Sequence, residues 1–407
     1  IPVVSKNMKP YKAPEHERDQ LLRAIQPLLD ENAAIPATSL CTHPSAIVKL
    51  DTGTAAPTYV PQYKLSDYMS GFVDKQVKIW DVNRVTVPAP KDSPWNNPII
   101  GALDEADRRN GKDPRICIDP RRLNDLLPDD PRSIPTVDAI HQRIYGFDHI
   151  TEIDLAKSFN QFTVAELDRI KTTFTWRNFK RMFRGSPFGL KTLSQLFQSV
   201  IEQIFHDHTD VTTPFIDNIY VHTRGTIQDH IEAVKKVLAL LNLYKLRINI
   251  KKCFFGYKAV MVLGHVLSST TKSVDMSKIS ALEDWPRPTT GKHIESFLGF
   301  TNYLRDFVPL YAEISEPLEK LRKLRKIGDH WSADCEASFQ MFKKVLSEAP
   351  ILNKPLPDVP YCIATDASQF GLGWVLYQQD PTTDNPRYIK FGAKSLNKAQ
   401  CNYGATR

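Results

Sequence analysis

Two aspartates in this sequence each belong to a short, apolar and branched segment that is typical of a β-strand. Asp154 lies near the end of the segment 150–155, and Asp217 lies within the segment 215–221. An antiparallel sheet can bring both carboxylates to one edge, where they repel each other unless cations lie between them. Hard oxygen ligands suit magnesium, and two magnesium ions can activate an attacking hydroxyl and stabilise a leaving phosphate oxygen. The pair therefore indicates metal-dependent chemistry at a phosphate group.

The segment around Asp217 is expected to form a hairpin. Branched and aromatic residues flank the pair Asp217 and Asn218, and such a pair favours a tight polar turn between two strands. A carboxylate at the tip of an apolar hairpin is held rigidly and faces solvent or a cleft. An ordinary surface turn uses the same residue types, so this segment alone leaves both interpretations open.

The surrounding sequence alternates between strand-like and helix-like patterns that could place these residues. Helical spacing of apolar residues predicts helices over residues 15–31, 66–80, 137–144, 186–205, 229–243, 294–307, 318–324 and 337–346. Strands are expected over residues 115–119, 150–155, 172–176, 246–250 and 262–266, and as a pair joined by a glycine turn within 362–378.

The composition is that of an ordinary soluble globular protein, with 42% hydrophobic and 24% charged residues. A chain of 407 residues is long enough for two or three domains. No window approaches eighteen uninterrupted apolar residues, so we expect no membrane span. The net charge of +7 and the pI near 8.9 are compatible with a polyanionic partner.

The cysteines and the first residues bear on the compartment. The six cysteines are scattered and form no CxxC pair, which indicates neither a zinc site nor a disulfide framework and fits a reducing compartment. The sequence begins at Ile1, without Met and without a basic-then-apolar leader. We therefore expect a processed product or a fragment that is intracellular, cytoplasmic or nuclear, and not secreted.

Eight groups of motifs follow one another along the chain. They are SPWNNPI (93–99), RICIDPRRLN (115–124), EIDLAKSFNQF (152–162), SPFGL with LFQ (186–198), FIDN (215–218), NIKKCFFG with VLGHVLS (249–268), WPRP with FLGFTNYLRDFV (285–308) and ATDASQFGLGWVLYQ (364–378). In order and spacing they resemble the reverse transcriptase region of a gypsy-type LTR retrotransposon polyprotein, from about residue 43 to the end. The last group resembles the first strands of the RNase H domain.

This resemblance implies the roles of the metal-binding residues. Asp154 and Asp217 would hold two Mg²⁺ ions, for which Mn²⁺ could substitute, with the backbone carbonyl of Leu155 as a further ligand. Lys252 would lie near the pyrophosphate leaving group, and the alternative for this residue is a solvated surface lysine.

The resemblance also implies a nucleotide site. Phe159 would be the steric gate that rejects a 2′-hydroxyl, although core packing is the alternative, and Phe188 would line the nucleotide pocket. Arg115 and Lys112 would hold the triphosphate, because charge-assisted contacts suit phosphate oxygens. Loop length varies here in the family, so Arg108 or Arg109 could take the place of Lys112.

The partners that the resemblance implies are an RNA or DNA template with a DNA primer, and deoxynucleoside triphosphates. Gly264 and His265 would form the primer grip and contact the primer backbone. Trp95 would pack either on the template strand or within the protein. The oligomeric state does not follow from the sequence.

The sequence departs from the family pattern in three places. Asn218 stands where the family has a second aspartate, so the site keeps its shape and loses a charge. The segment GALDEADRR (101–109) replaces a Val-rich strand and Lys-rich turn. Of the four nuclease carboxylates only the first, Asp366, is present in a sequence that ends at Arg407, so we expect no RNase H activity. These departures suggest a decayed transposon copy.

We therefore expect an α+β fold: a right-hand polymerase followed by a truncated RNase H-like domain. The expected domains are an N-terminal linker segment (1–42), fingers and palm (43–265), thumb and connection helices (266–350) and a partial RNase H-like domain (351–407). The expected function is RNA-directed DNA polymerase by two-metal nucleotidyl transfer, with activity impaired by Asn218. The alternative is an inactive relic that at most binds nucleic acid.

Overall fold

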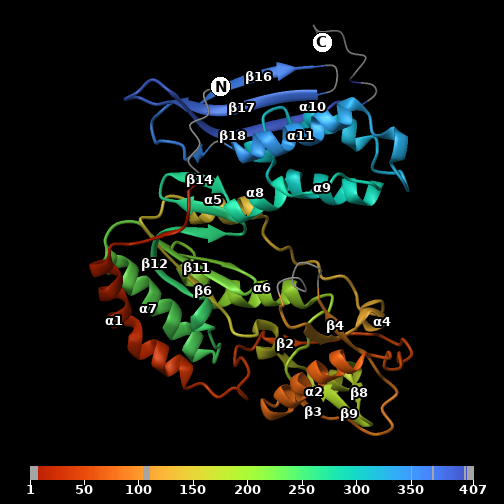
Figure 1. Ribbon diagram of the computed structural model, residues 1–407. Coiled ribbons are helices and arrows are strands. Elements are labelled where there is room, and N and C mark those ends of the chain that lie inside the picture. Colours follow the sequence, from red (N-terminus) through yellow and green to blue (C-terminus); the bar gives the residue numbers. More distant parts are fainter. Residues whose placement is uncertain (1–7, 104–110, 350, 369–370, 398–399, 401–407) are drawn as a thin grey trace. The chain divides into compact units, whose positions relative to one another are not determined.

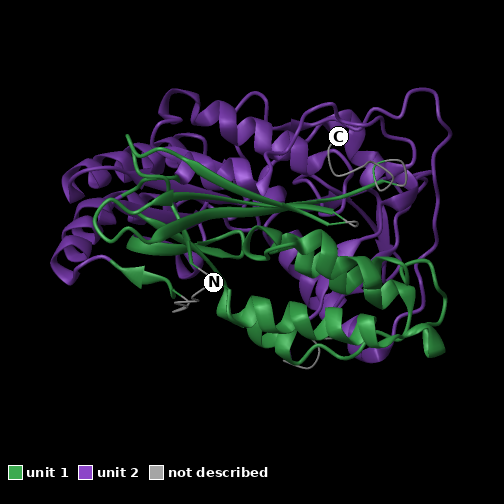
Figure 2. Ribbon diagram, turned by 90° about the horizontal axis from the view of Figure 1, so that it is seen from above, with its two compact units in different colours: residues 1–12, 145–147, 257–407 green, residues 13–144, 148–256 purple. Residues whose placement is uncertain are grey.

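The computed structural model describes residues 8–103, 111–349, 351–368, 371–397 and 400. The chain divides into two compact units, which Figure 2 shows in different colours. We call residues 13–144 and 148–256 the aspartate unit. The C-terminal unit is formed by the described residues of 1–12, 145–147 and 257–407.

Three antiparallel strands carry the two aspartates in the aspartate unit. They are β6 (His149–Asp154), β10 (Thr212–Phe215) and β11 (Asn218–Thr223). Strand β11 lies in the middle and pairs with both of the others. Its residues Ile219 and Val221 are completely buried, as is Ile153 of β6. Branched apolar side chains at alternate positions thus explain why these segments are strands.

Three helices pack with these strands. They are α1 (Glu15–Ala33), α6 (Leu193–Ile204) and α7 (Ile227–Leu243). Helices α1 and α7 lie side by side, as Figure 1 shows, and α7 contacts β6 and β11. Thr226 caps α7, and its side chain and that of Asp229 form a reciprocal capping box. Leu21, Ile25 and Leu29 of α1 are buried at helical spacing, as the sequence predicts.

The rest of the aspartate unit includes a second, smaller core. There Trp80 packs edge-on against the rings of Phe174 and Phe183. The helices of this part are α2 (Asp67–Val82), α4 (Arg121–Asn124) and α5 (Val137–Ile144). Its strands are β2 (Ile47–Val48), β3 (Thr86–Pro88), β4 (Ile99–Ala102), β5 (Arg115–Ile118), β7 (Thr163–Val164), β8 (Phe174–Trp176) and β9 (Phe179–Phe183).

The C-terminal unit combines two sheets with a group of helices. Its strands are β1 (Tyr11–Lys12), β12 (Phe254–Val262, whose first residues belong to the aspartate unit), β13 (His265–Ser268), β14 (Thr271–Val274), β15 (Leu352–Asn353), β16 (Cys362–Ala367), β17 (Gly371–Gln379) and β18 (Pro386–Ser395). Its helices are α8 (Met276–Glu283), α9 (Gly291–Tyr303), α10 (Tyr311–Glu319) and α11 (Ala333–Ser347). Strands β16, β17 and β18 form a separate antiparallel sheet.

The hairpin turn lies one residue earlier than the sequence predicts. Phe215 pairs with Asn218, so the two turn residues are Ile216 and Asp217, and Asn218 is the first residue of β11. Ile216 adopts a left-handed conformation with φ of 52°. Asn218 therefore belongs to the sheet and not to the turn.

Glycine and proline explain two further differences. The helix expected over 186–205 begins only at Leu193, because Pro187 and Gly189, with φ of 94°, interrupt the chain before it. The strand expected over 262–266 is a hairpin turn, in which Leu263 and Gly264 both have positive φ.

Two other expectations are wrong in detail. Residues 246–250 make only an isolated bridge, between Leu155 and Ile248, before a short 3-10 helix. The helix expected over 318–324 is α10, which ends at Glu319. The C-terminal strand pair expected within 362–378 is present as β16 and β17, and β18 adds a third strand to this sheet. Among the helices that the structure describes, none is both long and apolar enough to span a bilayer.

Candidate active site

Strand pairing brings the two aspartates to the same end of the sheet. Asp154 is the last residue of β6, and Asn218 lies directly opposite it in the antiparallel register. Asp217 precedes Asn218, and its backbone carbonyl accepts a hydrogen bond from the Leu155 N–H at 2.9 Å. The residues expected to form a metal site, Asp154, Leu155 and Asp217, are therefore adjacent, with Asn218 beside them.

The charge around Asp154 is unbalanced. Its side chain is only 16% exposed, and the Nζ of Lys252 lies 3.8 Å from its Oδ2. Burial raises the pKa of Asp154, and Asp217 raises it further, whereas Lys252 and a hydrogen bond from Asn249 lower it. The positive charge of Lys252 thus only partly offsets the burial of Asp154 and its repulsion by Asp217.

A third carboxylate lies on the same strand. Glu152 is two residues before Asp154, so both side chains emerge on one face of β6. Burial, followed by the charges of Asp154 and Asp217, raises the pKa of Glu152 to about 7. The sequence analysis missed this residue, although its two-residue spacing from Asp154 is a signal that could have identified it.

The donor atoms at this site fit a hard divalent cation. Asp154 and Asp217 offer carboxylate oxygens, and Asn218 offers an uncharged amide oxygen beside them. A cation between the carboxylates would relieve the repulsion that raises the pKa of Asp154. Within the described part of the chain, no three His, Cys, Asp or Glu side chains form a metal-binding group. The groups that could hold such a cation are thus the Asp154 and Asp217 carboxylates and the neutral oxygens beside them.

The two phenylalanines expected at the nucleotide site contact each other. Phe159 lies in a 3-10 helix (Ser158–Gln161) a few residues after Asp154, and its ring packs edge-on against Phe188 at 5.2 Å and Phe197 at 5.4 Å. Phe188 is 42% exposed, whereas Phe159 is partly buried. Phe159 therefore contacts both the core and a ring that remains open to solvent.

The residues expected to bind phosphate lie on the β4–β5 pair and its connection. Arg115 is exposed at the start of β5, opposite Ala102, and Lys112 is exposed just before it. Arg108 and Arg109 lie outside the described residues. Trp95 is only 5% exposed and packs in the main core, which supports its structural interpretation.

Three expected site residues belong to the C-terminal unit. Gly264 forms the β12–β13 turn, where a side chain would meet the Nζ of Lys278. His265 is only 2% exposed, its ring stacks on Phe307 at a centroid distance of 5.7 Å, and its strand β13 pairs with both β12 and β14, so the residue offers little surface to a partner. Asp366 lies exposed near the end of β16, and its Oδ1 accepts a hydrogen bond from the Ala367 N–H.

Comparisons with known proteins agree with this architecture. A profile described as "Reverse transcriptase (RNA-dependent DNA polymerase)" matches residues 108–267, and one described as "RNase H-like domain found in reverse transcriptase" matches residues 331–407. The retrovirus-related Pol polyprotein from transposon opus of Drosophila melanogaster is 30% identical over an aligned length of 421 residues, and the alignment covers 99% of this chain. The Pol polyprotein from transposon gypsy of the same organism is 26% identical over 95% of the chain. The chain spans 41% and 37% of these two polyproteins.

Solved structures show the same fold. The foamy viral protease-reverse transcriptase dRH in complex with double-stranded DNA superimposes with a TM-score of 0.83 at 20% identity, covering 97% of this chain and 68% of that one. The same viral enzyme in complex with an RNA/DNA hybrid gives 0.80 at 19% identity, covering 97% and 52%. The expected α+β polymerase fold is thereby confirmed.

Proposed function

Because the chain belongs to the reverse transcriptase family of retrotransposon Pol polyproteins, with an RNase H-like region after the polymerase, we propose that it is an RNA-directed DNA polymerase. The observation that carries this proposal is the β6–β11 register, in which Asn218 lies opposite Asp154 and Asp217 precedes it. The proposed substrates are a primer–template duplex and deoxynucleoside triphosphates. The basic net charge of +7 favours such polyanionic partners.

The chain's own residues have separate roles in this proposal. Asp154, Asp217 and the Leu155 carbonyl would hold two Mg²⁺ ions, which when bound lower the cost of charge on the attacking and leaving oxygens. Lys252 places a positive charge beside the carboxylates, on the side proposed for the leaving pyrophosphate. The exposed guanidinium of Arg115 suits the triphosphate, since it offers several donors in a fixed plane.

The two aromatic rings would select the sugar. Phe159 is held from behind by Phe197 and from the side by Phe188, so its ring cannot withdraw without disturbing the core. A ring fixed in this way excludes a 2′-hydroxyl by its bulk. Phe188 keeps an exposed face that is available to a nucleotide.

Primer extension tests this proposal. Purified protein is given poly(rA), an oligo(dT) primer and dTTP, with Mg²⁺ or Mn²⁺. We expect incorporation that Asp154→Asn or Asp217→Asn lowers by about 10² to 10³, the usual effect of removing one preorganised electrostatic group. Asp210→Asn is the matched control, because Asp210 is an exposed carboxylate in the same unit. Folded protein that incorporates no dTTP with either metal would contradict the proposal and favour an inactive relic.

A further inference from the structure

The amide of Gln198 is buried beneath the hairpin that carries Asp217. The residue lies on α6 and is only 1% exposed. Its Oε1 accepts the Ile216 N–H at 2.7 Å, and its Nε2 donates to the Pro214 carbonyl at 3.0 Å and to Glu202 at 2.9 Å. One amide orientation satisfies all three bonds, since the oxygen accepts one and the two N–H groups donate the others. Each hydrogen-bond donor of the Gln198 amide, and its oxygen, thus has a partner in one orientation of the side chain.

The hairpin needs such a partner. Ile216 is a β-branched residue with φ of 52°, a conformation that persists only where the surroundings impose it. Strand β10 is at the end of the strand order, so its Pro214 carbonyl depends on a group outside the sheet. Gln198 satisfies both of these backbone groups on either side of Phe215.

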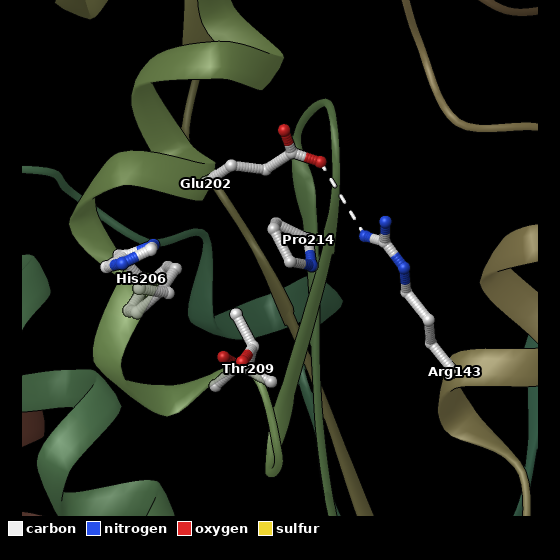
Figure 3. Close-up of a pocket in the computed structure, with 7 residues that line it drawn as sticks. Arg143, Glu202, His206, Thr209 and Pro214 are labelled. Carbon is white, nitrogen blue, oxygen red and sulfur yellow. Dashed lines mark ion pairs between the residues drawn. The ribbon is translucent and has the colours of Figure 1, made fainter.

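A chain of polar contacts holds Gln198 in turn. Glu202, one helical turn later on α6, accepts from its Nε2 and forms an ion pair with Arg143 of α5 at 3.7 Å. Figure 3 shows Glu202 and Arg143 reaching toward each other with Pro214 between them. They line a cavity of about 400 Å³. The cavity leaves the ion pair partly solvated, with 53% of Arg143 and 39% of Glu202 exposed.

We infer that Gln198, held by Glu202 and Arg143, is a positioning residue for Asp217. It fixes the left-handed Ile216, and Ile216 sets the point at which the chain turns toward Asp154. The one-residue offset of the turn, which puts Asn218 in β11, is a consequence of this contact. The effect on catalysis rests on the proposed function, whereas the effect on the hairpin does not.

The first test is Gln198→Leu, which keeps the volume and removes all three hydrogen bonds. We expect amide hydrogen exchange of Ile216 and Asp217 to become at least tenfold faster. In primer extension, kcat should fall at least tenfold with little change in the KM for dTTP, because the nucleotide contacts are elsewhere. Gln203→Leu is the matched control, since Gln203 is an exposed glutamine on the same helix. It should change neither measurement.

The second test asks whether the bonds or the shape matter. Gln198→Glu keeps the acceptor for the Ile216 N–H, but its carboxylate cannot donate to the Glu202 carboxylate or to the Pro214 carbonyl, so we expect slow extension. In the double variant Gln198→Glu/Glu202→Gln, an amide again donates to a carboxylate across the same contact, and extension should recover at least threefold. A role in packing alone predicts no recovery, because both changes conserve volume. If Gln198→Leu does not fold, the loss of extension in Gln198→Glu and its recovery in the double variant test the inference instead.

The outcomes separate this inference from the proposed function. Unchanged exchange at Ile216 in Gln198→Leu would overturn the inference, whatever the activity. Faster exchange with unchanged kcat in an active protein would overturn it as well. If the natural protein does not extend primers, the proposed function fails, and the exchange of Ile216 in Gln198→Leu against Gln203→Leu still decides the placement of the hairpin.

Discussion

Restoring a carboxylate at position 218 perturbs activity and stability in opposite directions. Asn218 lies directly across from Asp154, and side chains so paired have Cβ atoms about 5 Å apart. Two carboxylates at about 5 Å repel by about 3 kcal/mol at an effective dielectric constant of about 20. The Lys252 ammonium, 3.8 Å from Asp154, offsets part of this. We therefore expect Asn218→Asp to lower the free energy of unfolding by about 1–3 kcal/mol without metal at pH 7.

The same change should raise activity. The amide and the carboxyl group have nearly the same size, so no repacking is required. A tenfold increase in the extension rate needs only about 1.4 kcal/mol of additional transition-state stabilisation. We expect at least this factor, because the added charge lies beside the proposed metal ligands. Added Mg²⁺ should also reverse the loss of stability, since it binds only the folded site.

The assay compares the natural protein, Asn218→Asp and Asp217→Asn in primer extension and in thermal melts, with Mg²⁺ or with a chelator. The melting deficit of Asn218→Asp should shrink as the pH falls from about 7 to about 4, because a protonated carboxyl does not repel Asp154. If the natural protein does not extend primers and Asn218→Asp does not either, the change that abolished activity lies elsewhere, between Gly101 and Lys112. If the natural protein is active and Asn218→Asp does not raise its extension rate, the decay hypothesis is refuted and Asn218 is an adaptation.

Three further changes have defined outcomes. Phe159→Val should raise incorporation of ribonucleotides relative to deoxynucleotides by about 10- to 100-fold, because a smaller side chain no longer excludes the 2′-hydroxyl. The measurement compares rUTP with dTTP, and an unchanged ratio would show that another residue is the steric gate. Asn32→Ala should lower the free energy of unfolding by about 2–4 kcal/mol in urea melts, because the Asn242 Oδ1, the Leu246 carbonyl and the Ile248 N–H each lose the hydrogen bond that Asn32 makes to them. A loss below about 0.5 kcal/mol, as expected for a typical surface change, would contradict this. Burial raises the pKa of Cys41 from 9.0 to about 11, so alkylation of this thiol at pH 8 should be about 100-fold slower in the folded protein than in the unfolded chain. The alkylation rate should rise about tenfold per pH unit. Equal rates in folded and unfolded protein would show that the thiol is accessible.

Local pattern was enough to predict the strand that carries Asp154 and several helices of the aspartate unit. The helices found at α1, α5 and α7 follow from apolar residues at helical spacing, and β6 follows from its branched residues. Each of these signals is contained within a short stretch of chain. The pairing of β6 with β11 is not specified by any such local signal, and the sequence indicated only that an antiparallel sheet can bring both carboxylates to one edge.

The details that the sequence did not predict depend on residues far along the chain. The position of the turn at Ile216 follows from a hydrogen bond to Gln198, on the preceding helix. The raised pKa of Glu152 comes mainly from burial, and burial exists only once the strands and helices are assembled. Trp95 lies in a motif that predicts either template contact or packing, and only the assembled core decides for packing.

The division of the chain into two interleaved units has a consequence for its synthesis. Strand β1 pairs with β12, where Tyr11 lies opposite Ala259, and Phe147 lies under the ammonium of Lys354 within the same unit. At about 5–20 residues per second, a ribosome needs roughly 12–50 s to add the residues between Tyr11 and its partner. Until then β1 has no neighbour with which to form backbone hydrogen bonds. Strand β1 is therefore made well before its partner and can join the sheet only after the residues around Ala259 have been added.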